Sequence, residues 1–210
     1  GAGGALMLFW LLPRFADVSI VFNVFRYQTF RAAGAVVTAL LVSFLLGPAT
    51  IRWLRRLRFG QVIRTEGPAS HFEKAGTPTM GGVLILLSTT VSTLLWAQLD
   101  NWYTVLCLLA LIWMGLLGFL DDYLKVIRGK SEGLVARYKL LGQFGFGLGV
   151  GLFLMNHPIS PYSSAWTGVP FFSDWMLVFV GSAYVVFVAV VLAGTSNAVN
   201  LTDEIGRAHV

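Results

Sequence analysis

The sequence predicts an all-α, polytopic membrane protein with five transmembrane helices. Three observations lead to this fold class: the composition, the recurrence of uncharged stretches, and the uneven placement of Lys and Arg. Of the 210 residues, 56% are hydrophobic and only 12% are charged, whereas soluble domains carry about 25% charged residues. Apolar stretches recur along the whole chain, which excludes a secreted protein with a single leader peptide.

Five stretches without formal charge are candidates to cross a hydrocarbon core about 30 Å thick, which takes roughly 20 apolar residues. The predicted spans are Ala32–Ile51, Gly81–Leu99, Tyr103–Leu120, Leu140–Asn156 and Trp175–Gly194. An alternative with six spans would count Leu6–Leu12, but this run is short and is followed by Pro13 and Arg14. We expect a short N-terminal interfacial helix there instead.

The loops between the spans carry positive charge on one side only. The 52–79 and 121–139 loops hold eleven Lys and Arg, and the 100–102 turn and the 157–174 loop hold none. By the positive-inside rule the basic loops face the cytoplasm, which puts the N-terminus outside. The net charge of +5 is therefore interpreted as membrane orientation, and no nucleic-acid partner is expected.

Glycine spacing in the fourth span indicates close helix packing. The glycines are Gly145, Gly147, Gly149 and Gly151. This gives the small-xxx-small pattern that lets two membrane helices approach closely. A dinucleotide-binding loop would need a preceding strand and a different spacing.

Two adjacent carboxylates, Asp121 and Asp122, directly follow the third span. Like charges side by side repel each other, so a cation or a basic group has to compensate them. One or two carboxylates together with substrate phosphates are a typical Mg²⁺ site, and basic residues such as Lys125 and Lys139 suit phosphates. The alternative is a solvated helix end neutralised by nearby lysines.

A second cluster, His71–Gly82, leads into the second span. A helix start offers free backbone amides and a partial positive charge to an anion, and Lys74 and Thr79 would add to this. An ordinary capped helix start is the alternative.

A polar run, Gly194–Asp203, closes the fifth span. Within it Asn197, Asn200 and Asp203 are spaced three apart, so a helix would align them along one face. Amide side chains offer donors and acceptors that suit a nucleobase or a ribose. Capping and turn chemistry is the alternative.

These clusters resemble those of the bacterial phospho-N-acetylmuramoyl-pentapeptide transferases, within the polyprenyl-phosphate N-acetylhexosamine-1-phosphate transferase superfamily. The resemblance covers about Met7 to Asp203. The segments that carry it are Phe22–Tyr27, His71–Gly82, Gly118–Tyr123 and Gly194–Asp203. The acidic pair is shared across the superfamily, whereas Thr77–Gly82 and Asn197–Asp203 point to this member.

The resemblance implies a homodimeric membrane enzyme with ten transmembrane helices, of which this chain would be the first half. Such enzymes transfer phospho-MurNAc-pentapeptide from UDP-MurNAc-pentapeptide to undecaprenyl phosphate, giving lipid I and UMP with Mg²⁺. They act at the cytoplasmic face of the bacterial inner membrane. Asp121 and Asp122 would be catalytic and part of the metal site. Substrate binding is implied for Lys74, Thr79, Lys125, Lys139, Asn197, Asn200 and Asp203.

We expect residues 7–203 to be the native half of the transferase domain, with a non-native leader at 1–6 and a non-native tail at 204–210. The chain alone is expected to be inactive, because the resemblance implies a further metal-binding aspartate that the sequence lacks.

Three other functions compete with this hypothesis. The nearest is a sister transferase that uses a UDP-N-acetylhexosamine, against which the Thr77–Gly82 motif argues. A membrane transporter would require polar or acidic residues at mid-bilayer, and the five predicted spans contain no formal charge. A non-enzymatic scaffold would leave the polar clusters unexplained.

Overall fold

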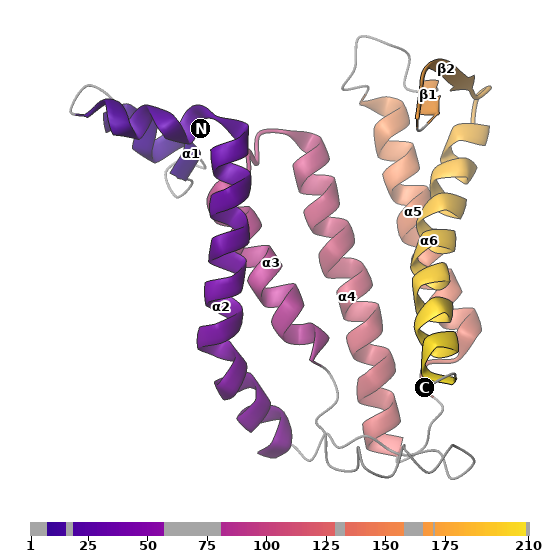
Figure 1. Ribbon diagram of the computed structural model, residues 1–210. Coiled ribbons are helices and arrows are strands. Elements are labelled where there is room, and N and C mark those ends of the chain that lie inside the picture. The colour runs from indigo at the N-terminus through magenta and orange to yellow at the C-terminus, as the bar shows by residue number, and fades with distance from the viewer. Residues whose placement is uncertain are drawn as a thin grey trace. The chain divides into compact units, whose positions relative to one another are not determined.

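A computed structural model gives the structure of the chain (Figure 1). It describes residues 8–15, 19–56, 81–128, 133–157, 166–169 and 171–208. The chain divides into two compact units, Gly1–Leu134 and Val135–Val210, and each is described by itself.

Where the structure describes it, the first unit holds short helical turns followed by three long helices. The short elements are α1 (Leu8–Leu11) and the 3₁₀ helices η2 (Leu12–Phe15) and η3 (Ile20–Arg26). The long helices are α2 (Gln28–Arg56), α3 (Gly82–Trp96) and α4 (Trp102–Arg128). The first and third predicted spans are therefore helical throughout, and the second is helical from Gly82 to Trp96. Helix α2 continues through Pro48.

Polar side chains tie α3 to α2. Ser92 Oγ donates to the backbone oxygen of Ala35 at 2.5 Å, and Trp96 Nε1 donates to Thr38 Oγ1 at 2.8 Å. Among apolar helices such bonds satisfy groups that hydrocarbon could not. Phe25 stacks on the Trp96 ring with 5.8 Å between centroids, so η3 packs at the same end of the helix pair.

At the other end of α2, Leu54 is only 1% exposed. Val83 from α3 and Phe119 and Val126 from α4 pack against it. Phe119 and Val126 are two turns apart, so one face of α4 is turned toward this contact. Asp121 lies on the opposite side of α4, since a helix turns by about 100° per residue.

The predicted position of the acidic pair at a helix end is wrong, because α4 continues to Arg128. Lys125 pairs with Asp121 one turn away, which favours helix at this point. The first helix-weakening residue after the pair is Gly129. The end of the uncharged stretch at Leu120 therefore marks the end of the apolar surface and not the end of the helix.

The described part of the second unit contains two helices and a hairpin. Its elements are α5 (Ala136–Asn156), β1 (Trp166–Val169), β2 (Phe172–Val178) and α6 (Ala183–Ala208). The two strands pair antiparallel. The all-α prediction is thus wrong for this segment, although the described part of the chain is mostly helical.

The predicted start of the fifth span at Trp175 is also wrong, because Trp175 lies in β2 and α6 begins at Ala183. Aromatic and β-branched residues favour an extended strand. Gly181 then adopts a positive φ of 56°, which glycine tolerates without steric cost. The backbone oxygen of Ser182 accepts the first helical hydrogen bonds, from Val185 and Val186.

The polar run Gly194–Asp203 does not close the helix as predicted, because α6 continues to Ala208. The hydroxyls of Thr195 and Thr202 donate to backbone oxygens four residues earlier, so these polar groups are satisfied inside the helix. The backbones of Asn197, Asn200 and Asp203 are all helical, which meets the condition under which their spacing aligns them along one face.

Glycines bring α5 and α6 into close contact. A Cβ atom at Gly147 would lie 2.6 Å from Ala189 Cα, and one at Gly151 would lie 2.9 Å from Val185 Cα. The other two glycines of the series have nothing within 4 Å. Close packing is therefore confirmed for the two glycines that lie one turn apart on the α6 side.

Among the described residues, three helices are long and apolar enough to cross a membrane: Gln28–Leu54 in α2, Trp102–Val126 in α4, and α5. Two shorter apolar helices accompany them, α3 and Ala183–Val199 in α6. Helices thus occur at all five predicted places, and the crossing of all five stays a prediction. A short helix is present at Leu8–Leu11, and its interfacial position stays a prediction.

We expect Gly147→Ala to destabilise the α5–α6 pair, because overpacking against backbone costs about 1–3 kcal/mol. Gly149→Ala is the matched control: it has open space, and alanine is favoured over glycine in a helix by about 1 kcal/mol. Thermal unfolding of the purified chain in detergent measures both. Equal stability of the two variants would contradict the close contact.

Candidate functional site

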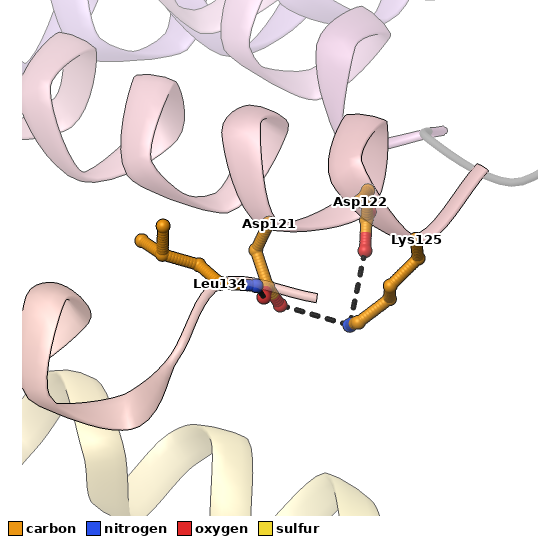
Figure 2. Close-up of polar contacts among 4 residues, drawn as sticks. All are labelled: Asp121, Asp122, Lys125 and Leu134. Carbon is orange, nitrogen blue, oxygen red and sulfur yellow. Dashed lines mark hydrogen bonds and ion pairs between the residues drawn. The ribbon is translucent and has the colours of Figure 1, made fainter. Parts of the chain in front are cut away.

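The acidic pair on α4 is bridged by one lysine (Figure 2). Lys125 Nζ lies 2.8 Å from Asp121 Oδ2 and 3.4 Å from Asp122 Oδ1. The helix allows this because residues three and four apart lie on one face. Lys125 therefore supplies the basic group that offsets the repulsion between the two carboxylates. Neutralisation by a nearby lysine was one of the two alternatives that the sequence left open.

Asp121 is the more tightly held of the two carboxylates. Its Oδ1 accepts a hydrogen bond from the backbone amide of Leu134 at 2.7 Å, so both of its oxygens are engaged (Figure 2). Its side chain is 16% exposed, compared with 42% for Asp122. Gly133 permits this approach, because a Cβ atom there would overlap Asp121. Asp122 is thus the carboxylate that is more open to a ligand.

The chemistry of the pair fits part of a Mg²⁺ site. Carboxylate oxygens are ligands that Mg²⁺ prefers, and it is usually held by one or two of them plus substrate phosphates. Within the ranges that the structure describes, no group of three or more His, Cys, Asp or Glu could hold a metal ion. Lys125 also occupies the position between the two carboxylates, so a cation would compete with its ammonium group.

A second polar cluster joins α5 to α6 near their cytoplasmic ends in the predicted topology. Gln143 is only 1% exposed. Its Nε2 donates to Ser196 Oγ at 3.1 Å, and its Oε1 accepts from Asn197 Nδ2 at 2.7 Å. Asn197 Nδ2 also donates to the backbone oxygen of Ala193 at 2.7 Å. Asn197, predicted as a site residue, is therefore fixed by two hydrogen bonds.

Lys139 belongs to the same end of the α5–α6 pair. It is partly exposed and lies one turn before Gln143 on α5. The two helices are antiparallel, since Gln143 meets Asn197 and Gly151 meets Val185. Lys139 is consequently level with the turn of α6 that holds Asn200.

The structure groups the described site residues into two clusters. Asp121, Asp122 and Lys125 meet on α4, and Lys139 and Asn197 share one end of the α5–α6 pair. Lys74 and Thr79 lie outside the described residues, as do the side chains of Asn200 and Asp203.

Sequence reasoning missed two contributors to these clusters. Gln143 had a signal, because it is the one amide within the apolar stretch 140–155, and polar residues inside membrane helices are often functional. The Leu134 amide had none, since any residue but proline carries that donor.

Comparison with known families identifies the chain. A family model described as Glycosyl transferase family 4 matches residues 102–206, which is half of the sequence. The chain belongs to glycosyl transferase family 4. A second model, phospho-N-acetylmuramoyl-pentapeptide-transferase signature 1, matches residues 74–86. The acidic pair lies within the first match, and Lys74 and Thr79 lie within the second.

Curated relatives extend this similarity over nearly the whole chain. A phospho-N-acetylmuramoyl-pentapeptide-transferase from Gemmatimonas aurantiaca is 49% identical over 205 residues. Relatives of the same name from Endomicrobium trichonymphae and Thermodesulfovibrio yellowstonii are 44% and 43% identical over 197 residues. Each alignment covers 94% of this chain and 54% of the relative. The resemblance drawn from the motifs is confirmed, and the chain spans about half the length of these relatives.

We expect Lys125→Gln to raise the affinity of the chain for a divalent cation, with Mn²⁺ as the probe, because the ammonium group no longer competes for the carboxylates. An interaction worth one pKa unit corresponds to about tenfold in affinity, and we expect an increase of about that size. Arg137→Gln, an exposed change in the second unit, is the control. Electron paramagnetic resonance of free Mn²⁺ measures binding, and unchanged affinity in Lys125→Gln would contradict the competition.

Proposed function

We propose that this chain forms part of an enzyme that transfers phospho-MurNAc-pentapeptide from UDP-MurNAc-pentapeptide to undecaprenyl phosphate. The products are lipid I and UMP, in peptidoglycan synthesis. The observation that carries the proposal is the Asp121–Asp122–Lys125 cluster, which lies just past the apolar part of α4 within the matched family region. The names of the relatives support the substrate.

The enzyme works at the cytoplasmic face of the bacterial inner membrane in this proposal. All five long helices cross the bilayer, the N-terminus is periplasmic, and α1 lies at the outer interface. The distribution of Lys and Arg supports this orientation, because the two loops that carry them would share one side. A homodimer is proposed from the resemblance alone.

The chemistry is a transfer between phosphates, for which positioning and charge stabilisation supply most of the catalysis. Incoming diphosphate draws Lys125 away from Asp121, since phosphate oxygens compete for the ammonium group. Asp121 Oδ2 then positions the phosphate of the lipid or accepts its proton. An oxygen of the lipid phosphate attacks the β-phosphate, and the bond to UMP breaks.

Asp122 and Asp121 would hold Mg²⁺ together with substrate phosphates, and its charge would neutralise the diphosphate. Lys74, Thr79 and Lys139 provide further contacts to phosphate in this proposal. A two-step route, in which an aspartate is the nucleophile, is the chemical alternative.

The uridine part of the substrate is assigned to the face of α6 that carries Asn197, Asn200 and Asp203. Amide and carboxylate groups can form directional hydrogen bonds to a nucleobase or a ribose. Asn197 supports this assignment because two hydrogen bonds hold it in place. A transferase for UDP-N-acetylhexosamine is the second candidate, since the broader family model matches 102–206, and a panel of UDP-sugars distinguishes the two.

Asp121→Asn tests the chemistry in a completed enzyme, in which residues 1–203 are joined to the part of the Gemmatimonas aurantiaca relative beyond the alignment. We expect UMP release to fall by about 10²–10⁴-fold, the usual contribution of acid–base catalysis. Asp100→Asn, an exposed aspartate in the turn before α4, is the control. Near-normal turnover of the Asp121 variant would remove this residue from the chemistry.

The 210-residue chain alone is expected to release no UMP, because its described residues offer only two adjacent carboxylates to a metal. The assay uses purified chain in detergent with UDP-MurNAc-pentapeptide, undecaprenyl phosphate and Mg²⁺, and the completed enzyme is the positive control. Mg²⁺-dependent release by the chain alone would refute this expectation.

A further inference from the structure

The amide network between α5 and α6 has only one possible direction. A backbone oxygen can only accept, so the Asn197 atom 2.7 Å from the oxygen of Ala193 is the nitrogen. The same nitrogen then donates to Gln143 Oε1 at 2.7 Å. This orientation leaves Gln143 Nε2 facing Ser196 Oγ at 3.1 Å. The carbonyl of Ala193 thereby fixes the orientation of both amides.

Burying the amide of Gln143 at this position has a high free-energy cost unless the amide is hydrogen-bonded. Its side chain is buried at 1% exposure, and the other residues of the stretch 140–155 are glycine or apolar. An amide removed from water without partners costs several kcal/mol, roughly 2–7. Both of its ends are satisfied, so the network offsets that cost. Leucine or methionine would fill the space without requiring a partner, but neither could accept the hydrogen bond that Asn197 donates.

The network determines what Asn197 can offer to a ligand. An asparagine amide has two N–H donors, and here both are used, one on Gln143 Oε1 and one on the oxygen of Ala193. Oδ1 is the remaining polar atom of this side chain. The two donated hydrogen bonds fix the amide plane, so this oxygen is held in one direction. A group that binds Asn197 must consequently donate a hydrogen, as the imide N–H of uracil and the hydroxyls of ribose do.

We propose that Gln143 is a positioning residue that locks the Asn197 amide, so that Asn197 presents only the acceptor Oδ1 to a donor group of the nucleotide. This inference rests on the proposed function, in which Asn197 contacts the uridine part of the substrate. It adds a residue to the site, and it specifies the polarity of one contact.

Kinetics of the completed enzyme test the positioning role. We expect Gln143→Met to raise KM for UDP-MurNAc-pentapeptide by about tenfold, the upper range for one lost hydrogen bond, while kcat changes by less than about threefold. Asn197→Ala should have a similar effect, and the double variant should be no worse than Asn197→Ala. Gln143→Glu keeps an acceptor for Asn197 and should restore most of the affinity. Ser92→Ala, which removes the buried cross-helix bond to Ala35, should leave KM unchanged.

Product analogues test the polarity in the unmodified protein. UMP should inhibit the completed enzyme better than at least one analogue that lacks a single donor: 3-methyl-UMP, 2′-deoxy-UMP or 3′-deoxy-UMP. We expect a loss of about tenfold for that analogue, as for one hydrogen bond. The loss should disappear in Asn197→Ala. This experiment does not depend on whether Gln143→Met folds, which thermal unfolding monitors.

The outcomes separate the two levels of the proposal. An unchanged KM in Asn197→Ala would overturn the proposed role of Asn197 and this inference with it. A raised KM in Asn197→Ala together with an unchanged KM in Gln143→Met would overturn the inference alone. Additive effects of the two substitutions would also overturn the inference alone, as would equal inhibition by UMP and all three analogues. The same holds if Gln143→Met and Gln143→Glu both lose stability and Gln143→Glu does not restore KM.

Discussion

A polar side chain among membrane helices has no water to bind, so it must find its partner inside the protein. This constraint accounts for both helix pairs that the structure describes in detail. Ser92 and Trp96 reach across to α2, and Gln143 reaches across to α6. Apolar side chains do not distinguish a neighbouring helix from lipid, whereas these bonds form at one register only. These few polar side chains therefore define the register in which the helices pack.

The same constraint gives the two aspartates of α4 different roles. Asp121 is mostly buried and satisfied on both oxygens by Lys125 and the Leu134 amide. Asp122 shares the lysine at a longer distance and is more exposed. A charged group that is held in this way is available to a reaction only when its partner has a better alternative. A phosphate-rich substrate offers Lys125 such an alternative, so binding and activation are linked through one side chain.

The sequence predicted where the long helices lie, because a run of apolar residues is a local property. It predicted their ends poorly, since the helix continues beyond the apolar surface in both α4 and α6. It also placed Trp175 in a span, because a short apolar run has no periodicity that separates strand from helix. The Asp121–Asp122 cluster was visible as two neighbours in the chain. The Gln143–Asn197 contact was not visible, because it depends on the register between two helices and joins residues 54 positions apart in the chain.

The buried amide of α5 also has a consequence for biosynthesis. Of the helices long and apolar enough to span a membrane, α5 is the least apolar. Without α6, it would expose glycine backbone and Gln143 on the side that α6 covers in the structure. Left by itself in lipid, this surface would lose hydrogen bonds and dispersion contacts together. The hairpin β1–β2 keeps α6 close behind in the chain. If α5 and α6 left the insertion machinery as a preassembled pair, that surface of α5 would never contact the acyl chains of the lipid.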